Sequence, residues 1–206
     1  MTSWDERFRS GDYPPDPEPS AVLQRYVDGL PAGRALDVAT GTGRNAVYLA
    51  EAGYHVEAID QSREGLRIAR ERARDRGVAD RLALVQADVP SSAFPTARYD
   101  LVTVSYYRAV DRFPDLREAL VDGGYLFVEH HLRATDPTSG GPRGDRYRFA
   151  ANELLHACLD LTVLHYEEGA EERAGGDHRA VARILARKSS GTKQSYPRSI
   201  APETRW

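Results

Sequence analysis

Several residue types and patterns are scarce in this chain of 206 residues. Cys158 is its only cysteine, which excludes an internal disulfide and a cysteine-based metal site and is typical of a reducing compartment. No apolar run approaches the ~20 residues that a membrane-spanning helix needs. The charged, proline-rich start lacks the apolar segment of a secretory signal. We therefore expect a cytoplasmic protein without a membrane partner.

An excess of charge of one sign is also missing. Lysine and arginine number 28 against 31 acidic residues, which gives a formal net charge of −3. A nucleic-acid-binding protein needs a basic surplus to displace counterions from phosphates, so the balance argues against such a partner. The histidines show no metal-ligand spacing, and no metal site is expected. The remaining expectation is a small-molecule ligand and a monomer or homodimer.

Short apolar runs alternate with helical patterns, which is typical of a parallel α/β sheet. Seven strands are expected, over residues 34–39, 54–59, 81–87, 99–105, 123–130, 161–167 and 178–187, and the fifth of these segments begins with a turn at Gly123. Four helices are expected, over residues 44–52, 63–76, 111–121 and 152–158. The connection between the last two strands is too short for a crossover helix, which predicts an antiparallel hairpin.

The chain divides into three expected parts. Residues 1–33 form an N-terminal arm, extended where prolines cluster, whose Trp4, Phe8 and Tyr13 are either a lid over a ligand or a hydrophobic anchor. Residues 34–188 form one α/β domain, with a long glycine- and proline-rich loop after its fifth strand. Residues 189–206 are polar without periodicity and are expected to be a disordered tail.

The most informative stretch is ALDVATGTGRNAVYLA, residues 35–50. Gly41 and Gly43 follow a strand and precede a helix, so the backbone can approach a ligand closely and the helix offers it free N–H groups. Open α/β sheets bind ligands at such carboxyl ends of strands. The stretch therefore predicts a cofactor site.

Two further acids end neighbouring strands. Asp60 ends the second strand, where a carboxylate can accept both hydroxyls of a ribose. Asp88 ends the third strand, where it suits the exocyclic amine of an adenine, with Val89 as an apolar contact to the ring. A simpler interpretation, in which the glycines only form a turn and the acids only cap helices, stays open.

A nicotinamide site is the competing ligand interpretation. The residues from Gly41 to Ala46 also fit the dinucleotide pattern G-x-G-x-x-A. However, Asp37 lies inside the first strand, where a dinucleotide site needs no carboxylate, and a dinucleotide fold does not require the terminal hairpin. Both features argue against the nicotinamide interpretation.

The order of these pieces resembles the class I S-adenosylmethionine-dependent methyltransferases over about residues 35–188. Their motif D/E-x-G-x-G-x-G is present from Asp37 to Gly43, with Ala39 in place of the first glycine. The segments WDERF, GTGRNAVYLA, YDLVTVSYY and GGYLFVEHH are similar to the tellurite-resistance and thiopurine-like small-molecule branch.

The resemblance implies a Rossmann-like, seven-stranded and mostly parallel sheet of order 3-2-1-4-5-7-6, with strand 7 antiparallel and helices on both faces. It implies S-adenosylmethionine as the cofactor and methyl transfer to a small-molecule acceptor. It also places Asp37 near the methionine amino end, Asp60 at the ribose and Asp88 at the adenine. The implied cofactor-binding residues are Asp37, Ala39, Gly41, Gly43, Asp60, Gln61, Asp88, Val89 and Ser105.

Acceptor-side candidates follow the fourth and fifth strands. Tyr106 and Tyr107 could contact the sulfonium methyl or stack on a flat acceptor, or could simply pack. His130 and His131 could take a proton from the acceptor or be ordinary strand-end residues, and alternation lets only one of them face the cleft. Further substrate-side candidates are Tyr13, Arg108 and Arg133.

The sequence thus predicts an S-adenosylmethionine-dependent methyltransferase. Two alternatives stay open: a non-catalytic module that binds S-adenosylmethionine, and an NAD-dependent oxidoreductase.

Overall fold

A computed structural model describes residues 3–11, 17–135, 142, 144–172, 178–189, 193 and 196–197. Tyr13 and most of the expected tail lie outside these residues.

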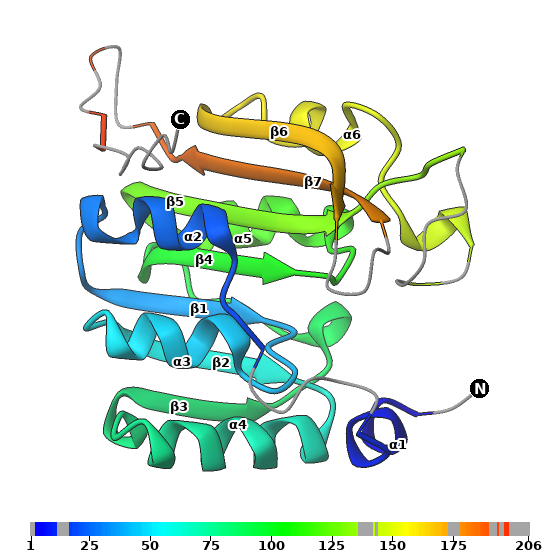
Figure 1. The fold of residues 1–206 in the computed structure, drawn as a ribbon. Helices are drawn as coiled ribbons and strands as arrows, with labels where there is room; N and C mark the ends of the chain where they lie inside the picture. The colour runs from blue at the N-terminus through cyan, green and yellow to red at the C-terminus, as the bar shows by residue number, and fades with distance from the viewer. Residues whose placement is uncertain are drawn as a thin grey trace, which may run out of the picture.

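Within the described chain, seven strands form a single sheet in the order β3-β2-β1-β4-β5-β7-β6 (Figure 1). Strands β1 to β5 are parallel, and β7 runs antiparallel to both of its neighbours. The expected topology is confirmed. The strands are β1 (Arg34–Val38), β2 (His55–Asp60), β3 (Leu82–Gln86), β4 (Tyr99–Ser105), β5 (Leu120–His131), β6 (Thr162–Glu172) and β7 (His178–Arg187).

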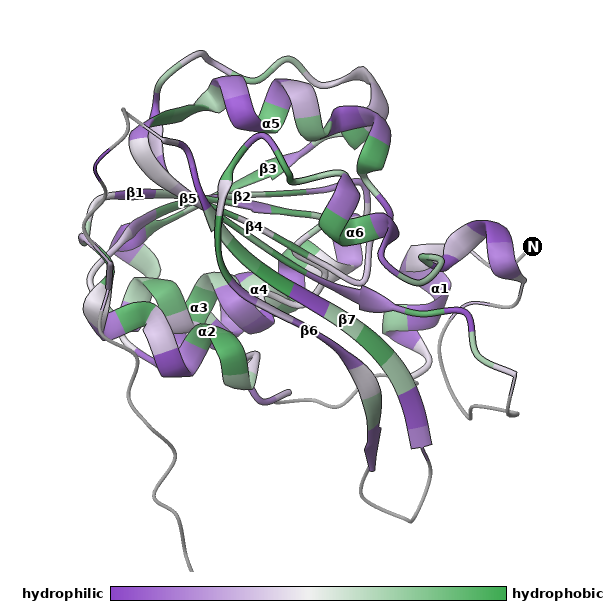
Figure 2. Ribbon diagram, turned by 90° about the horizontal axis from the view of Figure 1, so that it is seen from above, coloured by the Kyte–Doolittle hydropathy of each residue, from purple (hydrophilic) through white to green (hydrophobic). Residues whose placement is uncertain are grey.

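Helices cover both faces of the sheet, as expected (Figure 2). They are α1 (Trp4–Arg9), α2 (Ala21–Tyr26), α3 (Arg44–Glu51), α4 (Arg63–Asp75), α5 (Phe113–Ala119) and α6 (Glu153–His156). Helices α2, α3 and α4 lie on one face, and α5 and α6 lie on the other. No helix in the described ranges has the length and apolar character needed to cross a membrane.

Two hydrophobic cores, one on each face, explain the strand patterns. Strand β4 is buried along almost its whole length because helices pack on both of its faces, and its apolar run is nearly continuous. Edge strand β3 is half-buried or exposed instead. The core strands that end at the candidate site are therefore held rigidly.

The structure departs from the sequence expectations in the start of β5, in the N-terminal arm, and in β6, which is expected over residues 161–167 and runs to Glu172. Helix α5 ends at Ala119, so β5 starts at Leu120 and runs through the expected turn at Gly123. The N-terminal arm contains α1 and α2, and α2 buries Val22, Leu23 and Tyr26 in the core. Part of the arm thus belongs to the packed domain.

The β6–β7 hairpin extends past the end of β5. His131, the last residue of β5, pairs with Val181, whereas β6 and β7 continue to pair as far as Glu172 and His178. We call residues 169–172 and 178–180 the hairpin overhang. In Figure 1 it curves beside the arrowhead of β5. The overhang therefore extends beyond the carboxyl end of β5, at the edge of the sheet where the parallel strands end.

Candidate functional site

The carboxyl ends of β1, β2 and β3 lie next to one another because these strands are parallel neighbours. The glycine turn follows β1, Asp60 ends β2 and Asp88 follows β3. Neighbouring strands are about 4.8 Å apart, so these groups form a row about 10 Å long. That length suits a nucleoside.

The glycine turn is fixed by left-handed backbone and by close packing. Gly41 (φ +55°) donates its N–H to Asp60 Oδ2 at 2.8 Å. Gly43 has φ +78°, and a Cβ there would lie 2.8 Å from the Cβ of Ala69 in α4. Only glycine fits at position 43 without a shift of α4.

Ala39 occupies the motif position where glycine is usual, and its φ of +55° explains that preference. Left-handed backbone costs an L-residue about 1–2 kcal/mol, and the greater freedom of unfolded glycine offsets part of this. We expect Ala39→Gly to raise the free energy of unfolding by up to about 1 kcal/mol in urea titrations. The control Ala50→Gly, inside α3, should lower it by at least about 1 kcal/mol. A destabilised Ala39→Gly protein would contradict this account of the turn.

Helix α3 begins directly after the turn and has no side-chain cap. Helix α4, by contrast, is capped by Ser62 Oγ, which accepts from the N–H of Gly65 at 3.0 Å, and by Asp5, which accepts from the N–H of Glu64 at 3.0 Å. The first amides of a helix need an acceptor, and an uncapped start is a ready anion site. The start of α3 can therefore receive a ligand carboxylate.

Asp60 supports the turn and can still accept hydrogen bonds from a ligand. It is 7% exposed, and its Oδ1 accepts from the N–H of Ser62 at 2.8 Å. Burial raises the pKa of Asp60, although backbone N–H bonds to the carboxylate oppose the rise. Each carboxylate oxygen can accept a second hydrogen bond. Asp88 is exposed, and its carboxylate makes no hydrogen bond within the described chain, while Val89 is buried.

Asp37 acts as an internal brace. Its Oδ2 accepts from Thr40 Oγ1 at 2.6 Å and its Oδ1 from Thr103 Oγ1 at 2.5 Å. Burial raises the pKa of Asp37. The carboxylate thereby ties the end of β1 to β4, and its expected contact with the methionine amino end stays a prediction. Ser105 accepts from Asn45 Nδ2 at 2.9 Å, which joins β4 to α3, whereas Gln61 is exposed.

Helix α1 lies over the glycine turn. Asp5 accepts from Ser62 Oγ at 2.5 Å, and a Cβ added to Gly41 or Gly65 would lie 3.3 or 3.1 Å from the Phe8 ring. Trp4 stacks on Phe8 with ring centroids 5.8 Å apart. Helix α1 therefore covers the glycine turn. The role of Trp4 and Phe8 as a lid that opens and closes over a ligand stays a prediction.

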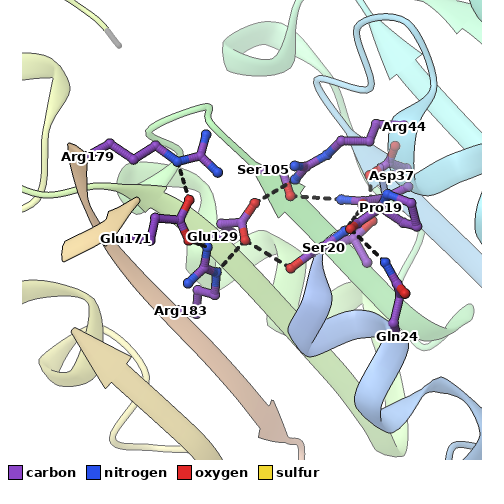
Figure 3. Close-up of polar contacts among 12 residues, drawn as sticks. Pro19, Ser20, Gln24, Asp37, Arg44, Ser105, Glu129, Glu171, Arg179 and Arg183 are labelled. Atoms are coloured by element: carbon purple, nitrogen blue, oxygen red, sulfur yellow. Dashed lines mark hydrogen bonds and ion pairs between the residues drawn. The ribbon is translucent and has the colours of Figure 1, made fainter. Parts of the chain in front are cut away.

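A buried carboxylate, Glu129 of β5, joins three segments on the other side of the turn (Figure 3). It is 1% exposed. Its Oε1 accepts from Arg44 at 2.6 Å, and its Oε2 accepts from Arg183 at 2.5 Å and from Ser20 Oγ at 2.9 Å. Burial alone would raise the pKa of Glu129, but the two arginines hold it at about 2. Glu129 therefore binds the first residue of α3, the residue before α2 and a residue of β7.

The hairpin supplies further matched charges. Arg183 also pairs with Glu167 at 2.9 Å and with Glu171, and Arg179 in the overhang pairs with Glu171. Figure 3 shows Arg179, Glu171, Arg183 and Glu129 as one chain of contacts. Each arginine of this group has a carboxylate partner, so the group carries little surplus charge.

Tyr106 follows β4 with left-handed backbone (φ +55°). The guanidinium carbons of Arg44 and Arg179 lie 5.0 Å from its ring centroid, and the His131 ring lies 4.8 Å away. The protein's own side chains thus contact this ring, which disfavours the interpretation that it stacks on a flat acceptor. Tyr107 is half-buried against the core.

His130 and His131 have different surroundings, as strand alternation predicts. His130 Nε2 is 2.8 Å from the carbonyl of Tyr147, and its ring meets Phe149 edge-on, whereas His131 contacts Tyr106. Burial lowers the pKa of His130 to about 4 and that of His131 to about 3. Both are neutral near pH 7 and hold a proton weakly. The expected role of either as a base stays a prediction.

Arg108 and Arg133 hold the segment after β5. Arg108 pairs with Glu153 of α6, and Arg133 Nε donates to the carbonyl of Asp145 at 3.1 Å. Their roles toward a substrate stay predictions. In the described part of the chain, no group of three or more histidine, cysteine or acidic residues is placed to hold a metal ion.

Sequence reasoning missed most of the Glu129 group. Glu129 itself left a signal, because an acid inside a buried apolar strand needs charged partners. No sequence pattern identifies its partners Arg44, Arg183 and Ser20, because they are far from Glu129 in the sequence and only the fold brings them together.

Comparison with known proteins adds to this geometry. Residues 35–124 match the family described as a methyltransferase domain. The chain is similar to two ubiquinone/menaquinone biosynthesis C-methyltransferases UbiE. The relative from Azotobacter vinelandii (strain DJ) is 32% identical over 149 residues, which are 67% of this chain and 57% of that protein. The relative from Pseudomonas putida is 37% identical over 154 residues, which are 70% of this chain and 60% of that protein. The chain thus spans less than two thirds of both relatives.

Solved structures share the fold. TehB from Haemophilus influenzae has a TM-score of 0.65 at 24% identity, over 76% of this chain and 57% of that one. The [4+2]-cyclase SpnF has a TM-score of 0.66 at 21% identity, over 89% of this chain and 81% of that one. These structural similarities show that the chain has the same fold as both proteins, and nothing more.

Proposed function

We propose that this chain, whose residues 35–124 match the family described as a methyltransferase domain, transfers a methyl group from S-adenosylmethionine to a small-molecule acceptor. The observation that carries the proposal is the uncapped start of α3 next to the glycine turn and Asp60. One ligand that has an amino-acid carboxylate and a ribose on the same molecule satisfies both groups.

The residues along the carboxyl edge fit this cofactor. Asp88 and Val89 would hold the adenine, Asp60 would accept the ribose hydroxyls, and the first amides of α3 would bind the methionine carboxylate. The reacting end would then point toward β4 and β5, where Tyr106 and His131 lie. The cofactor and the acceptor therefore occupy neighbouring stretches of one edge.

Bound S-adenosylmethionine supplies an already activated methyl group on a sulfonium. The chain's own task is to place the acceptor in line with that methyl group and to exclude water. Helix α1 and the hairpin overhang flank the edge on either side, which suits this task. A strong base is dispensable in such a site, and this agrees with the weakly basic, buried histidines.

Calorimetric titration of the purified protein with S-adenosylmethionine, its demethylated product and NAD, each separately, tests the cofactor. We expect micromolar binding of the first two ligands and none of NAD. Binding of NAD alone would instead support hydride transfer. Absence of all binding would mean that the turn is only a scaffold.

A non-catalytic S-adenosylmethionine-binding module is the second candidate. The observation that favours it is the lack of a strong base on the proposed acceptor side, because burial lowers the pKa of His130 to about 4 and that of His131 to about 3. Incubation with methyl-labelled cofactor and a panel of thiols, amines and phenols separates the two candidates. Label transfer to any acceptor supports the methyltransferase.

A further inference from the structure

A surface cavity of about 300 Å³ lies between helix α4 and the edge strand β3, which run side by side at one end of the sheet (Figure 1). The residues that line it are Arg70, Ala73, Arg74, Ala79, Leu82 and Leu84. The alanines and leucines make the lining apolar, and the two exposed arginines add positive charge. The cavity is therefore open to solvent and can receive a partner that is both apolar and anionic.

Arg70 and Arg74 have no carboxylate partner in the described chain. Neither guanidinium makes a hydrogen bond or an ion pair with a described residue. Arg67 on the same helix pairs instead with Glu64 and Glu71. Arg70 and Arg74 also stand at positions i and i+4 of α4, where like charges repel each other and destabilise a helix. Two unpaired arginines that repel each other beside an apolar cavity indicate an anion from outside the chain.

Strand β3 has a free backbone edge beside the same cavity. It pairs with β2 and is the outermost strand of the sheet on this side. The N–H of Ala87 donates to the carbonyl of Asp60 at 3.0 Å. In a parallel ladder, this register directs the N–H and C=O groups of Leu84 and Gln86 away from β2. These groups have no backbone partner among the described residues, and an added strand would supply one.

The spacing of the arginines matches that of side chains in an added strand. Leu82 and Leu84 face α4, because both line the cavity together with residues of that helix. The positions opposite them in an added strand also face α4 and lie about 6.8 Å apart. Arg70 and Arg74 are four residues apart on α4, which is a rise of about 6 Å. Acidic side chains at alternate positions of the added strand can therefore pair with both arginines.

The positions between these acids face the other side of the sheet. Val85 of β3 is 40% exposed there, so an apolar residue beside it would remove apolar surface from water. A second copy of this chain is a poorer occupant. Antiparallel pairing of β3 with β3 of another copy would bring Arg70 and Arg74 close to the same two arginines of that copy, and these like charges repel.

We propose that the α4–β3 edge, which consists of the cavity and the outward backbone of β3, binds an extended segment of another protein in which acidic and apolar residues alternate. The segment adds a strand beside β3. Its acids pair with Arg70 and Arg74, and its apolar residues cover Val85. The inference does not depend on the proposed function, because the cavity includes Ala79 before β3, whereas Asp88 of the proposed cofactor site follows β3.

Synthetic peptides test the binding mode with the purified full-length chain. The probe is a labelled peptide in which glutamate alternates with valine, and fluorescence anisotropy measures its Kd at low salt, where exposed charge pairs are least screened. One control peptide has the same composition with all glutamates adjacent, and another carries N-methyl groups on its glutamate amides. We expect the alternating peptide to bind at least about fivefold more tightly than either control. Equal binding of all three peptides would show a non-specific basic surface and overturn the proposal.

Substitution of the arginines tests their part in the site. Arg70→Gln combined with Arg74→Gln should raise the Kd of the alternating peptide about 2- to 30-fold, the effect of two exposed ion pairs. The control combines Arg67→Gln with Arg117→Gln, which removes the same charge from arginines that already have carboxylate partners. The control should change the Kd by less than about 2-fold. Equal weakening in both double variants would assign the effect to net charge and contradict the proposal.

Amide hydrogen exchange locates the peptide on β3. With the alternating peptide bound, the N–H groups of Leu84 and Gln86 should exchange at least about tenfold more slowly. The N–H of Val85 points toward β2 in the same register and should change little, which makes it an internal control. Unchanged exchange at Leu84 and Gln86 in the complex would place the peptide elsewhere and reject the added strand.

Light scattering of the protein alone, with and without the alternating peptide, tests a second copy as the occupant. We expect the peptide to leave the oligomeric state unchanged. An oligomer that dissociates when the peptide is added would assign the α4–β3 edge to self-association and overturn the proposal. Because none of these measurements needs S-adenosylmethionine, their outcome is separate from that of the cofactor titration.

Discussion

Glu129→Gln is expected to lower the free energy of unfolding by about 3–5 kcal/mol at pH 7, the usual effect of removing one member of a buried ion pair. The substitution keeps the size of the side chain but leaves Arg44 without its anion and Arg183 with fewer anions. Urea titration measures the change. Glu167→Gln is the control, because Glu167 contacts the same Arg183 from a 40% exposed position and should matter by less than about 1 kcal/mol.

The contribution of Glu129 should also depend on pH. Its folded-state pKa of about 2 lies below its ordinary value of 4.5, so the stabilisation is complete above about pH 5 and is lost as the pH falls from about 4.5 toward 2. The difference between the wild type and Glu129→Gln should therefore shrink over that window. A difference that is constant down to pH 2.5 would contradict the ion-pair account.

Asp60→Ala is expected to weaken S-adenosylmethionine binding by about 5- to 150-fold, which corresponds to about 1–3 kcal/mol for ligand hydroxyls left unpaired. It should also lower the free energy of unfolding by about 1–3 kcal/mol, because the N–H groups of Gly41 and Ser62 lose their acceptor. Calorimetry and urea titration measure the two effects on the same sample.

Asp88→Ala is the matched control for Asp60→Ala. Its exposed carboxylate has no hydrogen bond within the described chain, so stability should change by less than about 0.5 kcal/mol while affinity falls. Full affinity in Asp60→Ala at normal folding would remove the ribose contact from the proposal.

The topology, and the positions of the turn and acids of the proposed cofactor site, could be predicted from the sequence because their signals are local. A buried parallel strand is a continuous apolar run, and the turn after β1 carries its glycines within seven residues of Asp37. The left-handed angles at Gly41 and Gly43 follow from residue type. Asp60 and Asp88 stand at strand ends that the same alternation of elements locates.

The remaining features depend on contacts that the fold creates. Helices α1 and α2 have six residues each and flank the proline cluster, so the periodicity is too short to identify them. The early start of β5 through Gly123 depends on its pairing with β4 and β7 rather than on residue type. Strand alternation separated His130 from His131, but no pattern indicated that Arg179 would reach Tyr106 from the overhang.

The Glu129 group has a consequence for how this protein can evolve. The segment that matches the methyltransferase-domain family ends at residue 124, whereas Glu129, His131, Arg179 and Ser20 all lie outside it. Arg44 and Tyr106, which also border the proposed acceptor side, lie inside the matched segment, so the match covers the proposed cofactor residues and only part of the acceptor side. The other residues of that side come from segments outside the match. We expect substitutions in the hairpin overhang to alter the proposed acceptor side while the turn after β1 stays intact. Relatives with the same glycine turn can accordingly diverge in what they methylate.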